Sequence, residues 1–503
     1  MHRPNILIIL SDEQRYDTLG CTGNSVARTP NLDGLAERGT VFDYCYTPFP
    51  LCCPARASLW TSRMPHNHHV VGNWFAVRPE YRNDGLICDF AQAGYHTIYS
   101  GKWHMPGTKP ERIGFADWSA IPAVVNGRDR GRYIEDYRRY LAVNGYELIP
   151  GSMENLTPQD KEHLHRAGKA PCGRSAVRLE HYLEPWQTRQ FLGNLRRRPK
   201  DRPFFAVTSY SAPHFPMIVP APYDRLIDPE AIELPENFCE SLEGKPEEIR
   251  TCHYHTDYQD LDEGEWRRLI AHYYGFCSLV DAQVGTILKY LRDENVLANT
   301  IVVCATDHGD MMGSHGLNQK GHPMHYEETN RVPLIVTHPE LRGGVRVGSL
   351  VSLMDVLPTL ADLTGVSLNG EVEGFSLAGL MEGRIGRRVR DSVLSETFLV
   401  NGKPGGNGEY FDPRRFAEER DVVNLSIRTE KEKYVFHYDD SDELYDMESD
   451  PGEMRNLIEV PSYGSRKVKL RQRLLADLRD DMPRLAETVV GKMREKEKTS
   501  VRR

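Results

Sequence analysis

The sequence predicts an α/β fold in which a large, mainly parallel sheet carries helices on both faces. Short apolar, β-branched runs alternate along the chain with stretches of helical periodicity, which is the pattern of such sheets. The 503 residues correspond, at ~150 residues per domain, to roughly two to four units or to one large α/β domain with an appendage.

The predicted elements begin with residues 6–10, an apolar run ended by polar residues, which is typical of a central parallel strand. Residues 29–39 predict a helix, because Asn31 suits an N-cap, leucines lie three residues apart and Gly39 is a stop signal. The same patterns predict strands at 41–46, 96–100, 204–209, 301–305 and 333–337, and helices starting at 57–62 and spanning 86–93 and 266–291.

Changes of pattern divide the chain. Residues 1–385 are predicted to form the main α/β domain, with the charged, Gly- and Pro-punctuated segment 110–187 inserted as loops over the sheet. Residues 386–490 are predicted to form a smaller α+β C-terminal subdomain, with antiparallel strands at 422–428 and 433–438 and an amphipathic helix at 467–485. The basic tail, residues 491–503, is expected to be disordered.

Composition excludes several classes of protein. With 39% hydrophobic and 27% charged residues the chain is globular rather than disordered, and a net charge of −9 gives no basic footprint for nucleic acid. No apolar run approaches the ~18 residues of a membrane span, and the N-terminal run is too short for a signal peptide, so we expect a cytoplasmic protein. The ten cysteines, without zinc-site spacing, are then expected to be free thiols. The sequence does not determine the oligomeric state, and a homo-oligomer is one of the options.

Cys52 lies in the most specific segment. Pro54 and Arg56 follow it and a helical run comes next, which places Cys52 at a helix N-terminus where the dipole and Arg56 would stabilise an anion. As a thiol, Cys52 is a candidate activated nucleophile; the alternative is a small buried cysteine before a helix.

Polar residues also follow two predicted strands. Asp12 and Glu13 come after residues 6–10, and Asp307 and His308 come after residues 301–305. Carboxylates at strand C-terminal ends lie in the crevice where open α/β sheets bind ligands. Taken alone, Asp12 could instead be a helix N-cap and the Asp-His pair a surface loop.

The segment Cys52-x-Pro54-x-Arg56 and the Ala-Ser-Leu after it resemble the signature of the sulfatase family, within the alkaline-phosphatase superfamily. Ala55 stands where Ser is commoner. Motifs that resemble the family run from residue 5 to about 457: the two strand ends, Gly-Lys-Trp-His at 101–104, Ala-Pro-His at 212–214, Arg-Val-Pro at 331–333 and the segment 442–453. The likeness extends to bacterial arylsulfatases, choline sulfatases and phosphonate monoester hydrolases, and it implies an alkaline-phosphatase-like fold.

The resemblance implies two cofactors. A formylglycine-generating enzyme, as a transient partner, would oxidise Cys52 to Cα-formylglycine. One divalent ion (Ca²⁺, Mn²⁺ or Mg²⁺) would be bound by Asp12, Glu13, Cys52, Asp307 and His308, with Glu13 standing where most sulfatases have a second aspartate. Carboxylates suit Mg²⁺ or Ca²⁺ and the imidazole favours Mn²⁺, so the identity of the metal is open.

The resemblance also implies a cationic pocket that the net charge conceals. The residues it makes catalytic, with Cys52, are Arg56, Lys102, His104, His214 and Lys320, and those it makes substrate-binding are Asn73, Lys102, His214 and Lys320. Lys102 and His104 alternate, so on an extended stretch both would point to one face. The segment after Lys320 is about two residues longer than usual and holds His322 and His325. Either a bulged loop still positions Lys320, or one of these histidines shares its role.

The predicted function is hydrolysis of a small sulfate monoester (aryl, choline-like or sugar) through the gem-diol of formylglycine. The alternative is a phosphonate monoester or phosphodiester hydrolase, which Ala55 and His308 favour and which Lys102 and His104 disfavour. A third possibility is a non-catalytic binder of sulfated ligands that keeps Cys52 as a thiol. Segments 110–187 and 237–262 are expected to determine specificity.

Overall fold

The computed structural model describes residues 3–121, 132–146, 172–238, 240–384, 388–399, 422–479 and 482–500. Parts of the predicted insertion (122–131 and 147–171), Cys239, the predicted domain boundary at 385–386 and the last residues of the predicted tail (501–503) lie outside the described residues.

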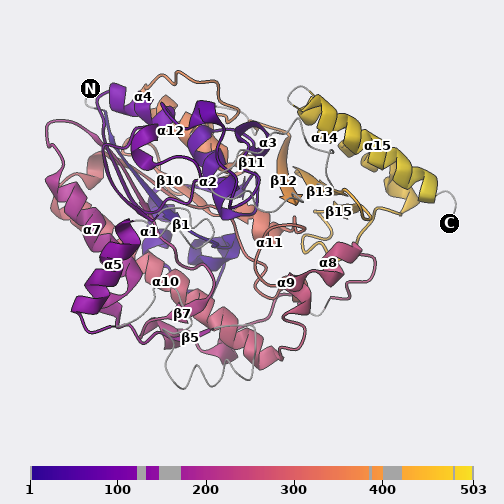
Figure 1. Cartoon of the computed structure of the whole chain (residues 1–503), viewed down its shortest axis with the longest axis horizontal. Helices are drawn as coiled ribbons and strands as arrows, with labels where there is room; N and C mark the ends of the chain where they lie inside the picture. The colour runs from indigo at the N-terminus through magenta and orange to yellow at the C-terminus, as the bar shows by residue number, and fades with distance from the viewer. Residues whose placement is uncertain are drawn as a thin grey trace.

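The core of the molecule is a mixed, mostly parallel sheet, as predicted (Figure 1). Its order is β11 (Val345–Ser352), β2 (Thr40–Tyr46), β10 (Leu334–Thr337), β8 (Thr300–Thr306), β1 (Asn5–Ser11), β6 (Phe204–Ser209), β3 (His96–Lys102) and β4 (Asp117–Ile121), with β9 (Arg331–Val332) paired to β2. Only the pairings of β10 and β9 are antiparallel. Strands β8, β1, β6 and β3 are therefore parallel neighbours, and their carboxyl ends meet at one edge of the sheet.

Helices cover both faces of this sheet (Figure 1). Helices α2 (Cys52–Thr61), α4 (Leu86–Gln92) and α12 (Val356–Thr364) pack on the face to which Ile6, Ile8 and Leu10 of β1 point. Helices α1 (Pro30–Arg38), α7 (Leu183–Arg197) and α10 (Glu263–Asp293) pack on the opposite face, with Leu7 and Ile9. A strand buried on both faces needs apolar residues at every position, which explains the unbroken apolar run of β1.

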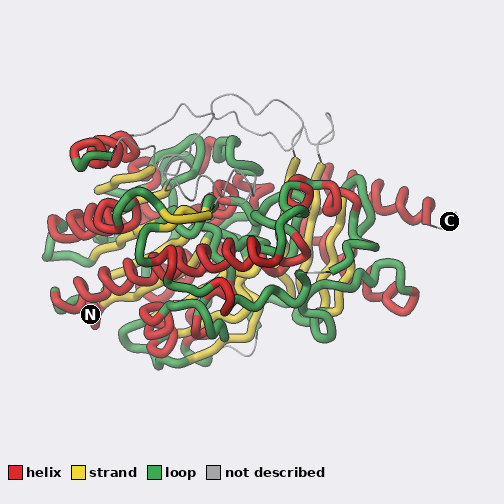
Figure 2. The backbone as a smooth tube through the Cα atoms, turned by 90° about the horizontal axis from the view of Figure 1, so that it is seen from below, coloured by secondary structure: helices red, strands yellow, loops and turns green. Residues whose placement is uncertain are grey.

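The C-terminal part contains a separate antiparallel sheet (Figure 2). Its strands are β12 (Ser392–Leu399), β13 (Val422–Thr429), β14 (Glu432–His437) and β15 (Glu443–Asp446), and helices α14 (Gly464–Arg479) and α15 (Pro483–Ser500) share its hydrophobic core. The sequence predicted a single helix at 467–485 and a disordered tail from 491. The single helix is wrong because a second helix starts at Pro483, and residues 491–500 are helical because Val489 and Met493 are buried in this core.

The segment predicted as an insertion, 110–187, is only partly loop. Strand β4 extends the main sheet beside β3, and α5 (Arg132–Val143) and the start of α7 are helical. The edge position of β4 leaves Trp118 41% exposed, which explains why the sequence pattern was too weak to predict a strand.

Shorter elements complete the fold: α3 (Pro65–His68), β5 (Cys172–Arg174), β7 (Met217–Val219), α8 (Glu247–Thr251), α9 (His253–Thr256), α11 (Glu327–Asn330) and α13 (Ala378–Met381). Within the described ranges, none of the helices has both the length and the apolar character needed to cross a bilayer. All nine described cysteines are free thiols.

Candidate active site

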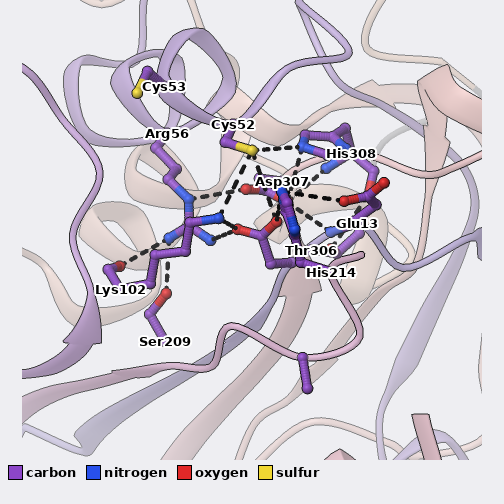
Figure 3. A network of polar contacts seen from close by, with 12 residues as sticks. Glu13, Cys52, Cys53, Arg56, Lys102, Ser209, His214, Thr306, Asp307 and His308 are labelled. Carbon is purple, nitrogen blue, oxygen red and sulfur yellow. Dashed lines mark hydrogen bonds and ion pairs between the residues drawn. The ribbon is translucent and has the colours of Figure 1, made fainter. Parts of the chain in front are cut away.

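The polar residues predicted from strand ends converge at one place (Figure 3). Asp12 follows β1, Asp307 follows β8, Lys102 ends β3, and Cys52 is the first residue of α2. Because α2 begins above the carboxyl edge of the sheet, its N-terminus and the strand ends face the same space. Cys53, by contrast, points away from this cluster (Figure 3).

Four buried side chains, that of Cys52 among them, are arranged so that they could hold a metal ion. Asp12, Cys52, Asp307 and His308 each offer one ligand atom, and these atoms lie within 4.8 Å of one another. His308 Nε2 lies 3.2 Å from Cys52 Sγ. His308 Nδ1 lies 2.9 Å from the Gly309 carbonyl oxygen, so Nδ1–H donates there and Nε2 is left with a lone pair. Two carboxylates and one imidazole fit a divalent cation.

Arg56 holds Asp12 and Asp307 in place through hydrogen bonds. Its buried guanidinium donates from Nη2 to Asp12 Oδ2 (2.7 Å) and from Nε to Asp307 Oδ2 (2.8 Å). Nη1 donates to Ser209 Oγ (2.7 Å) and to the Lys102 carbonyl oxygen (3.0 Å). The planar fork of arginine can reach both carboxylates at once, which a lysine cannot do. Arg56 therefore sets the distance between Asp12 and Asp307.

Lys102 stands between a carboxylate and the cysteine. Its Nζ lies 2.5 Å from Asp12 Oδ2 and 3.8 Å from Cys52 Sγ. Burial alone would raise the pKa of Asp12, but the charges of Lys102 and Arg56 hold that pKa well below its usual range. Asp12 is consequently a carboxylate at neutral pH.

His104 reaches the site by a different path from the one predicted. Strand β3 ends at Lys102 and His104 has a φ of 50°, so the expectation of an extended stretch with both side chains on one face is wrong. A left-handed residue turns the chain and aims the imidazole independently of the strand alternation. His104 Nδ1 is buried and has no hydrogen-bond partner among the described residues. Burial and the nearby charges of Lys102 and Arg56 lower the pKa of His104, so the imidazole is neutral and can accept a proton.

Glu13, His214 and Lys320 form a second group beside the first. Lys320 Nζ is paired with Glu13 Oε2 and lies 3.1 Å from His214 Nε2, which is 3.3 Å from Glu13 Oε2. His214 Nδ1 lies 2.6 Å from the Phe215 carbonyl oxygen, so Nε2 is the acceptor for Lys320. Burial raises the pKa of Glu13 despite the Lys320 charge, and Glu13 Oε1 is buried without a partner among the described residues.

The contacts of Lys320 answer the question left open by the longer segment after it. Lys320 reaches Glu13 and His214, whereas His322 and His325 lie 3.3 Å and 3.1 Å from Thr397 Oγ1 in the C-terminal sheet. The structure therefore places Lys320, rather than His322 or His325, beside Glu13 and His214. Glu13, Asp12 and His214 form a second set of groups that could hold a metal ion, and Asp12 belongs to both sets.

Asn73 lies at the N-terminus of α2. Its Oδ1 accepts a hydrogen bond from the Cys53 N–H (3.0 Å), one of the amide groups that a helix leaves unpaired at its start. This contact fixes the helix end that carries Cys52. Ser209 is a residue that the sequence analysis missed, although its place at the end of β6, beside β1, could have suggested it.

The Cys52 thiol itself is not activated. Burial, with a further contribution from the Asp12 charge, raises its pKa to about 11. Nucleophilic cysteines need a depressed pKa, so the hypothesis of an activated thiol gains no support here.

The fold and the site define an α/β enzyme whose buried cations and carboxylates converge at strand ends to receive an anionic substrate. A family model described as "Sulfatase" matches residues 4–366, and one described as "N-sulphoglucosamine sulphohydrolase, C-terminal" matches residues 313–480. The chain belongs to the sulfatase family, and it is an enzyme of the sulfuric ester hydrolase type.

Individual relatives agree with this family. An arylsulfatase of Clostridium perfringens is 31% identical over 497 residues, which cover 95% of this chain and 94% of that protein. A choline-sulfatase of Rhizobium meliloti is 30% identical over 479 residues, which cover 91% and 83%. Among solved structures, the phosphonate monoester hydrolase of Agrobacterium radiobacter has a TM-score of 0.77 at 22% identity and covers 95% of this chain and 96% of its own. At that identity the likeness shows the fold alone.

Proposed function

We propose that this protein hydrolyses sulfate monoesters at Cys52, after a formylglycine-generating enzyme has converted this residue to Cα-formylglycine. When formed, the hydrated aldehyde supplies a hydroxyl nucleophile and a second hydroxyl through which sulfate can be released. The high pKa of the thiol supports conversion, because an unmodified Cys52 would be a poor nucleophile at neutral pH.

Asp12, Asp307, His308 and residue 52 would hold one divalent ion. Such an ion supplies Lewis acidity and orients both reactants. The ligand atoms of these four buried residues lie within 4.8 Å of one another, which supports this proposal. Ca²⁺, Mg²⁺ and Mn²⁺ all remain candidates, and the imidazole favours Mn²⁺ or another transition ion.

Side chains of this protein would bind the sulfuryl group, accept the proton and position the reacting residue. Lys102 lies close enough to Cys52 to bind a sulfuryl oxygen, and Arg56 holds Asp12 and Asp307 apart at a fixed distance. The neutral imidazole of His104 would accept a proton from residue 52. Asn73 would keep the start of α2, and with it residue 52, in register with the substrate.

The leaving alcohol needs a proton, and Lys320 and His214 can supply it. Lys320 donates to His214 Nε2, so a proton can reach the ester oxygen from Lys320 directly or through the imidazole. Glu13 holds the Lys320 ammonium next to His214.

The observation that carries this function is the position of the Lys102 ammonium between Asp12 and Cys52, where a sulfuryl oxygen would be neutralised. Mass spectrometry of the peptide that spans Cys52, from protein co-expressed with a formylglycine-generating enzyme, tests the modification. The aldehyde mass supports the proposal, and an intact thiol in active protein contradicts it. A protein that retains the thiol and only binds sulfated ligands would be a binding module.

A phosphonate monoester or phosphodiester hydrolase is the second candidate, because the Agrobacterium radiobacter enzyme of that activity shares the fold. Turnover of 4-nitrophenyl sulfate and of 4-nitrophenyl phenylphosphonate separates the two. We expect a higher kcat/KM for the sulfate, since the Lys102 ammonium lies 3.8 Å from Cys52 Sγ; a preference for the phosphonate would favour the second candidate.

A further inference from the structure

Two side chains border Gly321, the residue that directly follows Lys320. Gly321 has a φ of +99°, and a methyl group placed on its Cα would have only two atoms within 4 Å beyond its chain neighbours. These atoms are the Tyr254 hydroxyl oxygen at 3.5 Å and Leu51 Cδ1 at 3.8 Å. A group that occupies this position therefore touches a hydroxyl on one side and a methyl on the other.

Leu51 and Tyr254 are both connected to the candidate site. Leu51 directly precedes Cys52, and Gly321 directly follows Lys320. Tyr254 belongs to α9, whose chain is fastened to the same loop: the Asn318 N–H donates to the Tyr254 carbonyl oxygen (3.0 Å), and Gln319 Nε2 donates to the Tyr258 hydroxyl (2.8 Å). The position of Tyr254 is thus set by the residues that come immediately before Lys320.

The Tyr254 hydroxyl is available for a ligand. It makes no hydrogen bond to any residue that the structure describes, and its side chain is half-buried against the ring of His253. Burial raises the pKa of Tyr254 to about 12, and the charges of Lys320 and Glu13 act on it, so the phenol keeps its proton close to the group that would assist the leaving alcohol.

We propose that Leu51, Gly321 and Tyr254 form a slot for the alcohol part of the substrate, in which the Tyr254 hydroxyl hydrogen-bonds an oxygen on the carbon next to the ester carbon. The substrate class is then the monosulfate of a vicinal diol on a ring, as in a sugar or a catechol. Leu51 supplies the apolar contact to the ring and Tyr254 the polar contact to its neighbouring hydroxyl. This proposal rests on the proposed function.

A matched pair of substrates tests the slot. Phenyl sulfate and catechol monosulfate differ only by the hydroxyl next to the ester, and their kcat/KM values are compared in the modified wild type and in Tyr254→Phe. We expect wild type to prefer catechol monosulfate, and Tyr254→Phe to lose up to about tenfold of that preference, mostly through a higher KM. The kcat/KM for phenyl sulfate should change by less than about twofold in Tyr254→Phe.

Tyr290→Phe is the control, because the Tyr290 hydroxyl is also without a partner among the described residues but lies on α10, on the opposite face of the sheet. Tyr290→Phe should leave the ratio of the two kcat/KM values unchanged. A general structural effect of Tyr254→Phe would instead lower kcat/KM equally for both substrates. An unchanged ratio in Tyr254→Phe, or no preference in wild type, overturns the slot while sulfatase activity stands. Failure of wild type to hydrolyse either sulfate would overturn the proposed function and the slot with it.

Discussion

His308 Nε2 lies 3.2 Å from Cys52 Sγ, so a residue at the end of β8 is in direct contact with the first residue of α2. The contact joins the start of a helix to the end of a strand, since Cys52 is the first residue of α2 and His308 follows β8. A cation held by His308 and the two aspartates would therefore also touch residue 52. The chemistry at residue 52 and cation binding therefore depend on the same geometry. A substitution of residue 52 can still remove the first and keep the second.

Replacing Cys52 with alanine is expected to abolish sulfate ester turnover while most of the metal binding survives. Alanine removes the precursor of the nucleophile but leaves Asp12, Asp307 and His308 in place. Hydrolysis of 4-nitrophenyl sulfate and metal content by mass spectrometry are the two measurements. Cys53→Ala is the matched control, because this neighbour points away from the cluster and its N–H still bonds Asn73 (Figure 3). Substantial activity in Cys52→Ala would contradict the formylglycine proposal.

Replacing Arg56 with methionine is expected to destabilise the protein by about 3–5 kcal/mol, because loss of the guanidinium leaves the buried Asp307 carboxylate without its paired cation. The measurement is the free energy of unfolding with and without added divalent cation, which avoids any effect of this substitution on the modification of Cys52. Added cation should recover part of the lost stability by binding the carboxylate that has lost its partner. Ser209→Ala, which removes one bond to the same guanidinium, should cost only about 1 kcal/mol.

Strand-end residues were predictable from the sequence because their position follows from a general rule. Asp12 and Asp307 follow fully buried apolar runs, and parallel strands must bring their carboxyl ends to one edge. The assignment of Cys52 to a helix N-terminus followed in the same way from Pro54 and the helical run. The six central strands β1, β2, β3, β6, β8 and β10 were therefore accessible from periodicity, whereas the edge strands β4 and β11 were not predicted.

Features that depend on single backbone angles or on distant partners were not accessible. His104 was expected on an extended stretch, but its left-handed φ cannot be inferred from alternation. Ser209 contributes through a bond to Arg56, 153 positions away in the sequence, and Tyr254 through its approach to Gly321. Edge strand β4 was missed because its half-exposed residues carry no apolar periodicity.

Substitution of Lys102 or His104 with alanine is expected to lower kcat/KM for sulfate esters by about two to four orders of magnitude. Lys102 would neutralise charge beside residue 52, and the buried imidazole of His104, whose pKa is lowered, would accept a proton. His96→Ala is the control, because His96 begins the same strand but pairs with Asp117 at the far end. Near-wild-type turnover in Lys102→Ala or His104→Ala would show that these side chains only contribute to the fold.

A buried histidine in the C-terminal sheet is expected to make stability depend on pH. Burial alone would lower the pKa of His437, but hydrogen bonds to Glu248 and Glu443 raise it to about 10. The folded pKa lies above the unfolded value, so this stabilisation is complete below pH ~6.5 and is lost as pH rises through about 10. The free energy of unfolding of wild type should fall over this range by a few kcal/mol more than that of His437→Gln. Parallel pH profiles would contradict the assignment.

Asp12 and Glu13 are expected to respond differently to replacement by the corresponding amide, although they are adjacent. Asp12 belongs to the four groups around Cys52, whereas Glu13 Oε2 is engaged by Lys320 and lies near His214. Asp12→Asn should therefore lose bound metal. Glu13→Gln should keep it and instead slow the hydrolysis of esters with poor leaving groups, because the carboxylate that positions Lys320 is gone.

Metal stoichiometry after gel filtration and a series of aryl sulfates of increasing leaving-group pKa distinguish the two roles. For Glu13→Gln, kcat should fall more steeply with leaving-group pKa than for wild type, and Lys320→Ala should show the same steepening. Equal loss of metal in Glu13→Gln and Asp12→Asn would make Glu13 a ligand, as the resemblance to the sulfatase family implies. In that case Lys320 would be held by a metal-bound carboxylate, and acid assistance and metal binding could no longer be separated by substitution at this position.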